Sequence, residues 1–303
     1  MEKILSGLAV AKQIKARLSA FIGDHSLEPR MALVQIGSDP ASGFYVQNII
    51  KQAAKLGCKV ELTELPESTE EQTLLQLIDR LNSDVSVDGI MIQKPLPRHI
   101  SDRLVNQAVT PEKDIDAVNP VNLGLLMMES PGFIPCTPYA VYLMMRFYGI
   151  DASGRKLCII GRSNVVGKPL AAIMLSKKPF CNATVTVCHS KTRNLPEIVR
   201  ESEIVVAAIG VPAFVSGEWI SPGTILIDVG INEVQGSDGK PVFIGDIDYN
   251  GCLDKALALT PVPGGVGSVT TAVLLMNLVK ATLLNRKLNK LVDGFDDLIF
   301  NAK

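Results

Sequence analysis

The sequence predicts an α/β protein of two domains, each with a parallel sheet covered by helices. Short apolar runs of strand length alternate along the chain with longer segments of helical periodicity. Strand, helix and strand in this order imply parallel strands joined by crossover helices. A length of 303 residues suits two domains of ordinary size or one large domain.

The composition is that of a soluble globular protein. Apolar residues make up 47% of the chain and charged residues 20%. Such apolar content excludes disorder, and this length buries a core without covalent staples. Lys and Arg total 30 against 31 Asp and Glu, so the net charge of -1 gives no overall electrostatic argument for nucleic acid or an anionic membrane as partner.

The cysteines and the chain start favour a cytoplasmic protein. Six cysteines form no C-x-x-C pair, and several lie in apolar runs, so we expect reduced thiols. The N-terminus lacks the continuous apolar stretch of a signal peptide. The longest apolar stretch, 269–284, is too short and too interrupted by polar residues to span a bilayer.

The first half of the chain predicts three strands and their helices. Apolar residues at helical spacing predict a helix over 8–22. Strands are expected at 31–37, 58–65 and 87–93. Helices are expected at about 43–56 and 69–81, with a turn at 38–42 before the first of them.

The second half of the chain shows the same alternation of predicted strands and helices. After a helix at 139–148, the pattern predicts strands at 156–161, 183–188, within 199–210 and at 224–231, and a helix at 168–175. A long helix begins at about Ser268, with a last helical piece near the end. We expect one domain at 1–145 plus 268–303 and a second at 146–267.

A candidate phosphate loop joins a strand to a helix in the second domain. The segment GRSNVVGKP (161–169) can aim backbone N–H groups and the positive end of a helix at a phosphate, with Gly161, Arg162, Ser163, Val166 and Gly167 at the site. Because Ser163 and Val166 replace two glycines of G-x-G-x-x-G, an ordinary strand-to-helix turn fits the motif equally well.

The next strand favours NADP, with NAD as the alternative. A unit that binds NAD carries an acidic residue at the end of this strand. Here His189, Ser190 and Lys191 follow, then Thr192 and Arg193, and no carboxylate occurs until Glu197. A hydroxyl and cations suit a 2′-phosphate, which Arg162 can also approach; a solvated loop face is the alternative. Ile231, the last residue of the strand predicted at 224–231, completes the expected cofactor-binding residues.

Four further segments carry polar groups just past predicted strands or at helix starts. Because ligands of open α/β sheets bind at the carboxyl ends of strands, these segments could form one crevice. Each alone has an ordinary explanation as core residue, cap or turn. The segments are SGFYVQNIIK (42–51), QKPLP (93–97), PEKDIDAVNP (111–120) and TPVPGGVGS (260–268).

These segments, with PCTP (135–138), GRSNVVGKP and HSKT, resemble the methylenetetrahydrofolate dehydrogenase/methenyltetrahydrofolate cyclohydrolase family over nearly the whole chain. The resemblance implies an N-terminal α/β folate domain, a Rossmann-type doubly wound NAD(P)-binding domain, a cleft between them, and a homodimer. It implies oxidation of 5,10-methylenetetrahydrofolate by hydride transfer to NADP, then hydrolysis to 10-formyltetrahydrofolate, in one-carbon metabolism and purine biosynthesis.

The resemblance also implies residue roles. Tyr45 matches a tyrosine that lines the pterin and aminobenzoate site, Gln93 a glutamine beside the reacting carbon, and Asp116 an aspartate that holds the pterin. Arg162 and Ser190 match the contacts to the 2′-phosphate. Folate-binding residues are also expected at Pro263, Gly264 and Gly265, where glycine lets the backbone approach a ligand.

One departure bears on the hydrolysis step. The family pattern is Tyr-x-x-x-Lys, and its lysine assists water addition, but this chain has Ile49 four residues after Tyr45. One hypothesis is that Lys94, beside Gln93, supplies the missing ammonium. Strand alternation points Lys94 to the other face, so it could equally be a surface lysine in a dehydrogenase with weak or no cyclohydrolase activity.

Two other functions compete with this one. A different Rossmann-type dehydrogenase would need a catalytic His or Lys near the nicotinamide, and His25, His99 and His189 lie outside the expected places. A non-catalytic folate- and NADP-binding protein is compatible with Ile49. Scattered histidines and cysteines give no ligand spacing, so no metal is expected.

Overall fold

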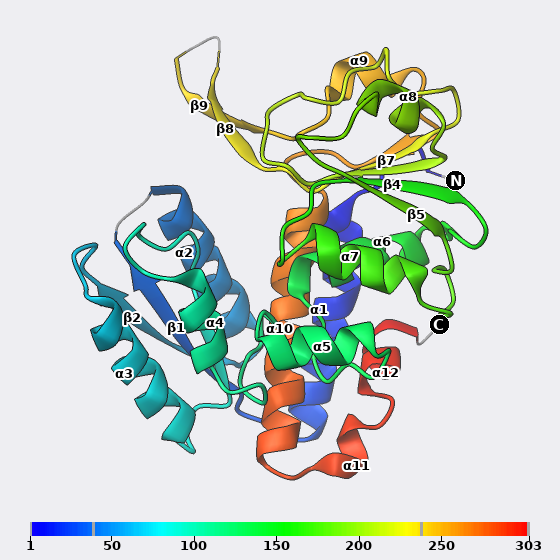
Figure 1. The fold of residues 1–303 in the computed structure, drawn as a ribbon. Helices are drawn as coiled ribbons and strands as arrows, with labels where there is room; N and C mark the ends of the chain where they lie inside the picture. The colour runs from blue at the N-terminus through cyan, green and yellow to red at the C-terminus, as the bar shows by residue number, and fades with distance from the viewer. Residues whose placement is uncertain (1, 38–39, 237–238, 302–303) are drawn as a thin grey trace. The chain divides into compact units, whose positions relative to one another are not determined.

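The computed structural model describes residues 2–37, 40–236 and 239–301 (Figure 1). The chain forms two compact units. Unit 1 comprises Met1–Lys12 and Pro135–Val273, and unit 2 comprises Gln13–Ile134 and Leu274–Lys303. The division passes within α1 and α10, so each of these helices contributes residues to both units.

Helices and strands alternate along the described chain. The helices are α1 (Gly7–Asp24), α2 (Pro40–Lys55), α3 (Glu71–Ser83), α4 (Asp102–Ala108), α5 (Pro120–Met127), α6 (Cys136–Phe147), α7 (Gly167–Leu175), α8 (Leu195–Arg200), α9 (Tyr249–Leu253), α10 (Val266–Asn285), α11 (Asn289–Val292) and α12 (Phe295–Asn301). The strands are β1 (Arg30–Ile36), β2 (Lys59–Leu65), β3 (Gly89–Ile92), β4 (Lys156–Ile160), β5 (Thr184–Cys188), β6 (Ile204–Ala207), β7 (Ile225–Asp228), β8 (Asn232–Gln235), β9 (Pro241–Ile244) and β10 (Ala258–Leu259).

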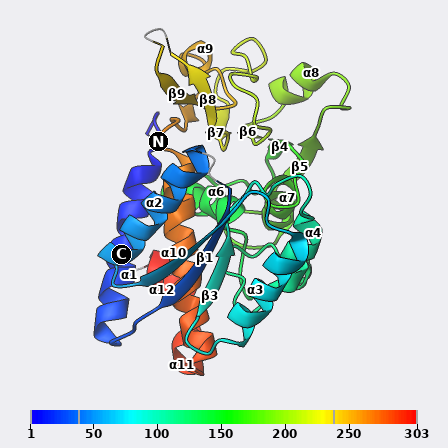
Figure 2. The ribbon, with the colours of Figure 1, turned by 90° about the vertical axis from the view of Figure 1, so that its left-hand side faces the viewer.

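Unit 2 contains a three-stranded parallel sheet in the order β2-β1-β3, with helices on both faces (Figure 2). One face packs against α3 and α4, through a cluster that includes Val34, Ile92 and Ile78. On the other face, Gly89 lies against Ile115 and against Leu278 of α10, so closely that a Cβ would collide with Ile115. Alternation along β3 therefore divides its side chains between α4 and α10.

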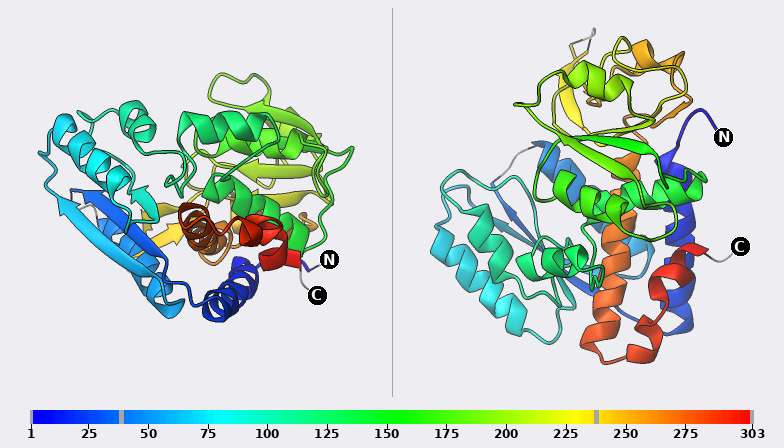
Figure 3. Two further views of the ribbon diagram at one scale, coloured as in Figure 1. Left: turned by 90° about the horizontal axis from the view of Figure 1, so that it is seen from below. Right: turned by 45° about the vertical axis from the view of Figure 1, so that its right-hand side comes forward.

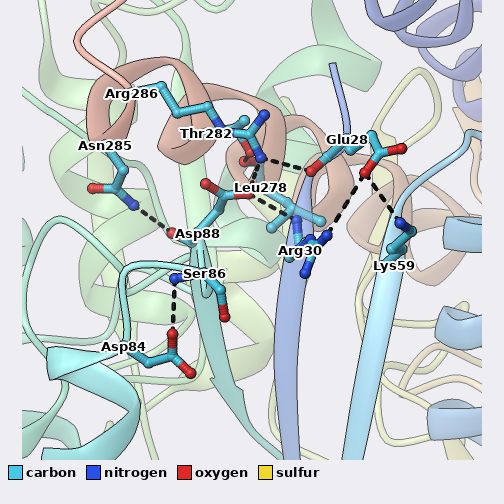
Figure 4. A network of polar contacts seen from close by, with 10 residues as sticks. All are labelled: Glu28, Arg30, Lys59, Asp84, Ser86, Asp88, Leu278, Thr282, Asn285 and Arg286. Atoms are coloured by element: carbon cyan, nitrogen blue, oxygen red, sulfur yellow. Dashed lines mark hydrogen bonds and ion pairs between the residues drawn. The ribbon is translucent and has the colours of Figure 1, made fainter. Parts of the chain in front are cut away.

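Polar contacts close the amino end of this sheet (Figure 4). The buried Asp88 carboxylate, just before β3, accepts the backbone N–H of Arg30 at 2.9 Å and pairs with Arg286 at 3.0 Å. Glu28, before β1, pairs with Lys59 at the start of β2 at 3.0 Å. These contacts tie the starts of β1, β2 and β3 to the end of α10.

Unit 1 contains a five-stranded parallel sheet in the order β10-β7-β6-β4-β5. The chain leaves β4 for β5 on one side and then returns to β6 on the other side of β4. This is the doubly wound topology, and its switch point lies between the carboxyl ends of β4 and β6. The short antiparallel hairpin of β8 and β9 stands apart from this sheet.

Helix α10 is a core helix. By length and composition it could cross a membrane, with a mean hydropathy of 1.5, but 78% of that window is buried inside the protein. The chain then turns back, and α12 packs on α1 (Figure 3): the rings of Phe21 and Phe295 meet edge to face at 5.1 Å, and Gln13 donates to the Phe300 carbonyl.

The predicted architecture is confirmed: the expected strands match those observed to within three residues at their ends, and β6 lies inside the predicted range 199–210. Of the predicted turn at 38–42, residues 38 and 39 lie outside the described part, and α2 already begins at Pro40. The expected domain boundaries at 145/146 and 267/268 differ from the compact units. Helix α6 packs against α7 and belongs to unit 1, as does the segment before α1, which pairs with β10.

Candidate active site

The glycine loop lies at the switch point of the unit 1 sheet. Gly161 follows β4 with a φ of +129°, and a Cβ there would collide with the carbonyl oxygen of Ala208, just past β6. A Cβ on Gly167 would collide with the carbonyl oxygen of Gly161. Both positions therefore need glycine, which explains why these two remain although the motif lacks the others.

The loop fits a dinucleotide phosphate. It leads into α7, nine residues long, and Ser163 stabilises the turn: its hydroxyl accepts the N–H of Val166 at 3.0 Å and its carbonyl that of Lys168 at 3.1 Å. Arg162 and Ser163 are exposed, so a cation and a hydroxyl stand at the positive end of a helix.

The end of β5 lies directly beside this loop. The N–H of Gly161 donates to the Cys188 carbonyl at 2.9 Å. The next residues form a turn in which the Thr192 N–H donates to the His189 carbonyl at 2.8 Å, leaving Ser190 and Lys191 exposed at its corner. The structure thus gathers Arg162, Ser190 and Lys191 at one edge, where the adenosine ribose binds in doubly wound folds.

Two buried aspartates that the sequence reasoning missed fix the neighbouring loops. Asp246 accepts N–H groups from Ile209, Gly210 and Val211 after β6, at 2.6 to 3.0 Å. Asp228, at the end of β7, accepts the N–H groups of Gly230, Asp246 and Ile247. Burial raises the pKa of Asp228 to about 6 against the effect of these bonds. The only signal was the position of each aspartate after an apolar run.

The segment TPVPGG (260–265) belongs to unit 1. Gly264 has a φ of +96° and its carbonyl accepts the Gly7 N–H at 2.9 Å, while Gly7 lies so close to the Gly265 carbonyl that a Cβ would collide with it. Pro263, Gly264 and Gly265 thus lie against the start of α1. Ile231, 60% exposed, lies close to Gly267 at the start of α10.

In unit 2, Gln93 extends β3 at the carboxyl end of the sheet. Its N–H donates to the Val34 carbonyl at 2.8 Å, so the residue is held in the ladder. The side chain is buried, and its Nε2 donates to the Lys94 carbonyl at 2.6 Å. Its Oε1 is buried without a hydrogen-bond partner among the described residues, which suits an acceptor reserved for a ligand.

Asp116 lies in the turn that follows a residue bridged to β3. The Ile90 N–H donates to the Lys113 carbonyl, and Ile90 and Asp114 form a parallel bridge, so this segment meets β3 at Ile90, three residues before Gln93. Asp114 is structural: it accepts the Asn119 N–H and the Asn122 amide, and burial raises its pKa. Asp116 itself is half-buried. The two aspartates of DID therefore differ in burial.

Tyr45 and Ile49 occupy adjacent turns of α2, which begins at the same carboxyl end of the sheet. Tyr45 is half-exposed, whereas Ile49 is fully buried. An apolar side chain thus fills the position at which the family pattern carries a lysine. Its neighbour Lys51 is exposed on another side of the helix, as the helical spacing predicts.

Lys94 points away from Gln93. Its ammonium pairs with the Asp102 carboxylate at the start of α4. The face of the sheet that carries α4 is the one to which Ile92 contributes, and Lys94 is two residues further on. This placement supports the surface-lysine alternative.

Within the described ranges, no cluster of three or more His, Cys, Asp or Glu side chains could hold a metal ion.

Two family models match the chain. The model of the tetrahydrofolate dehydrogenase/cyclohydrolase catalytic domain matches residues 5–116, and that of the NAD(P)-binding domain of the same family matches residues 135–286.

Curated relatives match over nearly their whole length. The bifunctional protein FolD of Chlamydia felis is 44% identical over 276 residues, covering 90% of this chain and 96% of that protein. The bifunctional protein FolD 2 of Geobacter sulfurreducens is 44% identical over 285 residues, covering 93% and 97%.

Solved structures share the fold. The methylenetetrahydrofolate dehydrogenase/cyclohydrolase of Campylobacter jejuni matches with a TM-score of 0.85 at 38% identity, covering 93% of this chain and 99% of that one. The Trypanosoma brucei enzyme, solved with NADP and an inhibitor, matches with a TM-score of 0.86 at 34% identity, covering 95% and 99%.

Proposed function

Because the chain belongs to the tetrahydrofolate dehydrogenase/cyclohydrolase family, we propose that it oxidises 5,10-methylenetetrahydrofolate to the methenyl form with NADP and then hydrolyses that product to 10-formyltetrahydrofolate. The observation that carries the proposal is the family match over both units. The matched regions include the glycine loop and the turn with Ser190 and Lys191 in unit 1. They also include Gln93 and Asp116, which lie on neighbouring segments of unit 2.

Unit 1 is assigned to the dinucleotide. NADP supplies a hydride acceptor when bound. Gly161 and Gly167 let the loop pack closely against the carbonyl oxygens of Ala208 and Gly161, which fixes the backbone that would receive the phosphates. Arg162, Ser190 and Lys191 provide a cation, a hydroxyl and a second cation for the 2′-phosphate, which favours NADP over NAD. Ile231 offers an exposed apolar side chain to a flat ring of the cofactor.

Unit 2 is assigned to the folate. Asp116 can accept two N–H bonds from the amino edge of a pterin, and Tyr45 offers an aromatic face to a flat conjugated ligand. The unpartnered Oε1 of Gln93 gains a donor when substrate binds. Hydride transfer itself needs orientation rather than acid–base catalysis, so these residues suffice for the first step.

The hydrolysis step has fewer groups to assist it. With Ile49 buried and Lys94 paired to Asp102, the described residues offer Gln93 and Asp116 to orient water. We therefore infer a slower hydrolysis than hydride transfer. The second candidate function is a dehydrogenase without cyclohydrolase activity, and Ile49 is the observation that favours it.

A single spectroscopic experiment tests these proposals. The protein is mixed with methylenetetrahydrofolate and either NADP or NAD, and the absorbance of the methenyl product is followed. We expect formation with NADP faster than with NAD, followed by slow decay. Formation without enzyme-dependent decay supports the dehydrogenase alone. No absorbance change, with retained binding of both ligands, would leave a non-catalytic binding protein and refute the proposal.

We further propose a homodimer in the cytoplasm that serves one-carbon metabolism and purine biosynthesis. The hairpin of β8 and β9 supports self-association, since a two-stranded ribbon is marginal alone and Val242 is 40% exposed. The six free, buried cysteines suit a reducing compartment. Light scattering at micromolar concentration gives the mass, and a monomer would refute the dimer.

A further inference from the structure

The turn that follows β5 is locked by one of its own side chains. The Nδ1 atom of His189 accepts the backbone N–H of Lys191 at 3.1 Å. An acceptor on residue i and an N–H on residue i+2 form the arrangement that asparagine and aspartate make in Asx turns. Because Nδ1 accepts this bond, it carries no proton, and the neutral ring has its proton on Nε2.

A second side chain closes the same turn. The backbone N–H of His189 donates to the Thr192 hydroxyl at 2.8 Å, and the Thr192 N–H donates back to the His189 carbonyl at 2.8 Å. Both residues are half-buried. The N–H, the carbonyl and the ring nitrogen of His189 are thus all used to fix four consecutive residues.

The two residues held at the corner of this turn are Ser190 and Lys191, and both are exposed. The turn is joined to the glycine loop through the Gly161 N–H and the Cys188 carbonyl, next to Arg162. A hydroxyl, an ammonium and a guanidinium at one edge form a site for a dianionic phosphate. Holding them before binding lowers the entropy lost on binding.

We propose that His189 is a positioning residue for NADP specificity, acting through its Nδ1 acceptor and with Thr192 as its partner, rather than by contact with the cofactor. This inference rests on the proposed NADP function. It assigns the discrimination between NADP and NAD to the rigidity of the turn as well as to the charges it carries.

Substitutions at His189 distinguish the effect of its hydrogen-bond acceptor from that of the imidazole ring as a whole. In H189A the Lys191 N–H loses its partner, and we expect the Kd for NADP to rise roughly 3- to 10-fold, as for loss of one hydrogen bond, with the Kd for NAD within twofold of wild type. In H189N the amide oxygen can accept the same N–H, so most of the lost NADP affinity should return. Binding is measured by titration calorimetry with each cofactor.

A matched pair at Thr192 tests the partner contact, and carries the test alone if H189A does not fold. T192V keeps the shape but removes the hydroxyl, and we expect weaker NADP binding with unchanged NAD binding. T192S keeps the hydroxyl and should bind NADP as wild type does. In an S190A/K191A background, H189A should cause little further loss, because the groups it positions are gone.

Several results would overturn the inference. Equal losses in H189A and H189N would mean that the ring, not the acceptor, matters. Equal losses of NADP and NAD affinity would indicate contact with the adenosine or a general structural role. Unchanged NADP binding in both H189A and T192V would remove any positioning role. Failure of wild type to bind NADP would instead refute the proposed function.

Discussion

The ammonium of Lys94 forms an ion pair with the carboxylate of Asp102 at the start of α4. The Lys94 side chain is 30% exposed and that of Asp102 67% exposed, so the pair lies at the surface. Alternation along β3 accounts for it, because Gln93 and Lys94 must leave the strand on opposite faces. The pair argues against Lys94 as a replacement for the missing lysine.

We therefore expect K94M to retain both hydride transfer and methenyl hydrolysis within about twofold of wild type, since exposed ion pairs contribute little. D102N, which removes the ion-pair partner of the Lys94 ammonium, serves as the control and should likewise leave both rates unchanged. Both rates are read from the absorbance of the methenyl product. A tenfold loss of hydrolysis in K94M with intact hydride transfer would instead establish the relocated ammonium.

Restoring a lysine at position 49 should raise hydrolysis and lower stability. Ile49 is fully buried, so the ammonium in I49K loses hydration and the free energy of unfolding should fall by on the order of 3 kcal/mol. I49M, of similar length but uncharged, should cost less than about 1.5 kcal/mol. We expect hydrolysis roughly tenfold faster in I49K than in I49M. Equal rates in the two folded variants would show that the lysine is not what limits this step.

Replacing Gly161 by alanine should abolish tight NADP binding. The φ of +129° and the carbonyl oxygen of Ala208 both exclude a Cβ, so the loop must shift. We expect the NADP Kd to rise more than tenfold and the free energy of unfolding to fall by about 2 kcal/mol or more.

Gly124 provides the contrast for that variant. It lies within α5, and a Cβ there would meet nothing within 4 Å. G124A should therefore leave NADP binding unchanged and stabilise the protein by up to about 1 kcal/mol in urea unfolding. If G161A binds NADP like wild type, the phosphate does not lie on this loop.

Asp228 should make stability fall as pH rises from about 4 to about 6. Burial raises the pKa of this carboxyl from 3.8 to about 6, so between these values the folded state holds a proton that the unfolded state has released. Asp228 contributes its full stabilisation at pH values below the pKa that it has in the unfolded state. This stabilisation is lost as the pH rises through the pKa of the folded state. The loss amounts to about 3 kcal/mol at most.

Urea unfolding at a series of pH values tests this, with D228N as the comparison because its amide does not titrate. Other groups also have shifted pKa values. The raised pKa of Asp114 likewise makes stability fall as pH rises, whereas the lowered pKa values of Glu28, Asp84 and Glu203 make stability rise with pH. The difference between the wild-type and D228N curves therefore carries the prediction. Parallel curves from pH 4 to pH 6 would contradict it.

Sequence periodicity predicted most of the fold, because it records which face of each element is buried. The strands β1, β2, β4 and β5 were placed correctly, since β1, β4 and β5 are largely apolar or β-branched runs and β2 alternates apolar and polar residues. Short elements such as α4, α5 and the hairpin of β8 and β9 were missed. They span only a few residues, and tertiary contacts rather than periodicity stabilise them.

The sequence by itself determined the α/β class, the glycine loop and the lack of a carboxylate after β5, because these depend on local residue types and spacing. Only the tertiary structure decided that Ile49 is buried, that Lys94 pairs with Asp102, and that Asp246 anchors residues 209–211. Those facts depend on which distant segments meet, and side-chain hydrogen bonds between such segments leave no periodic signal in the chain.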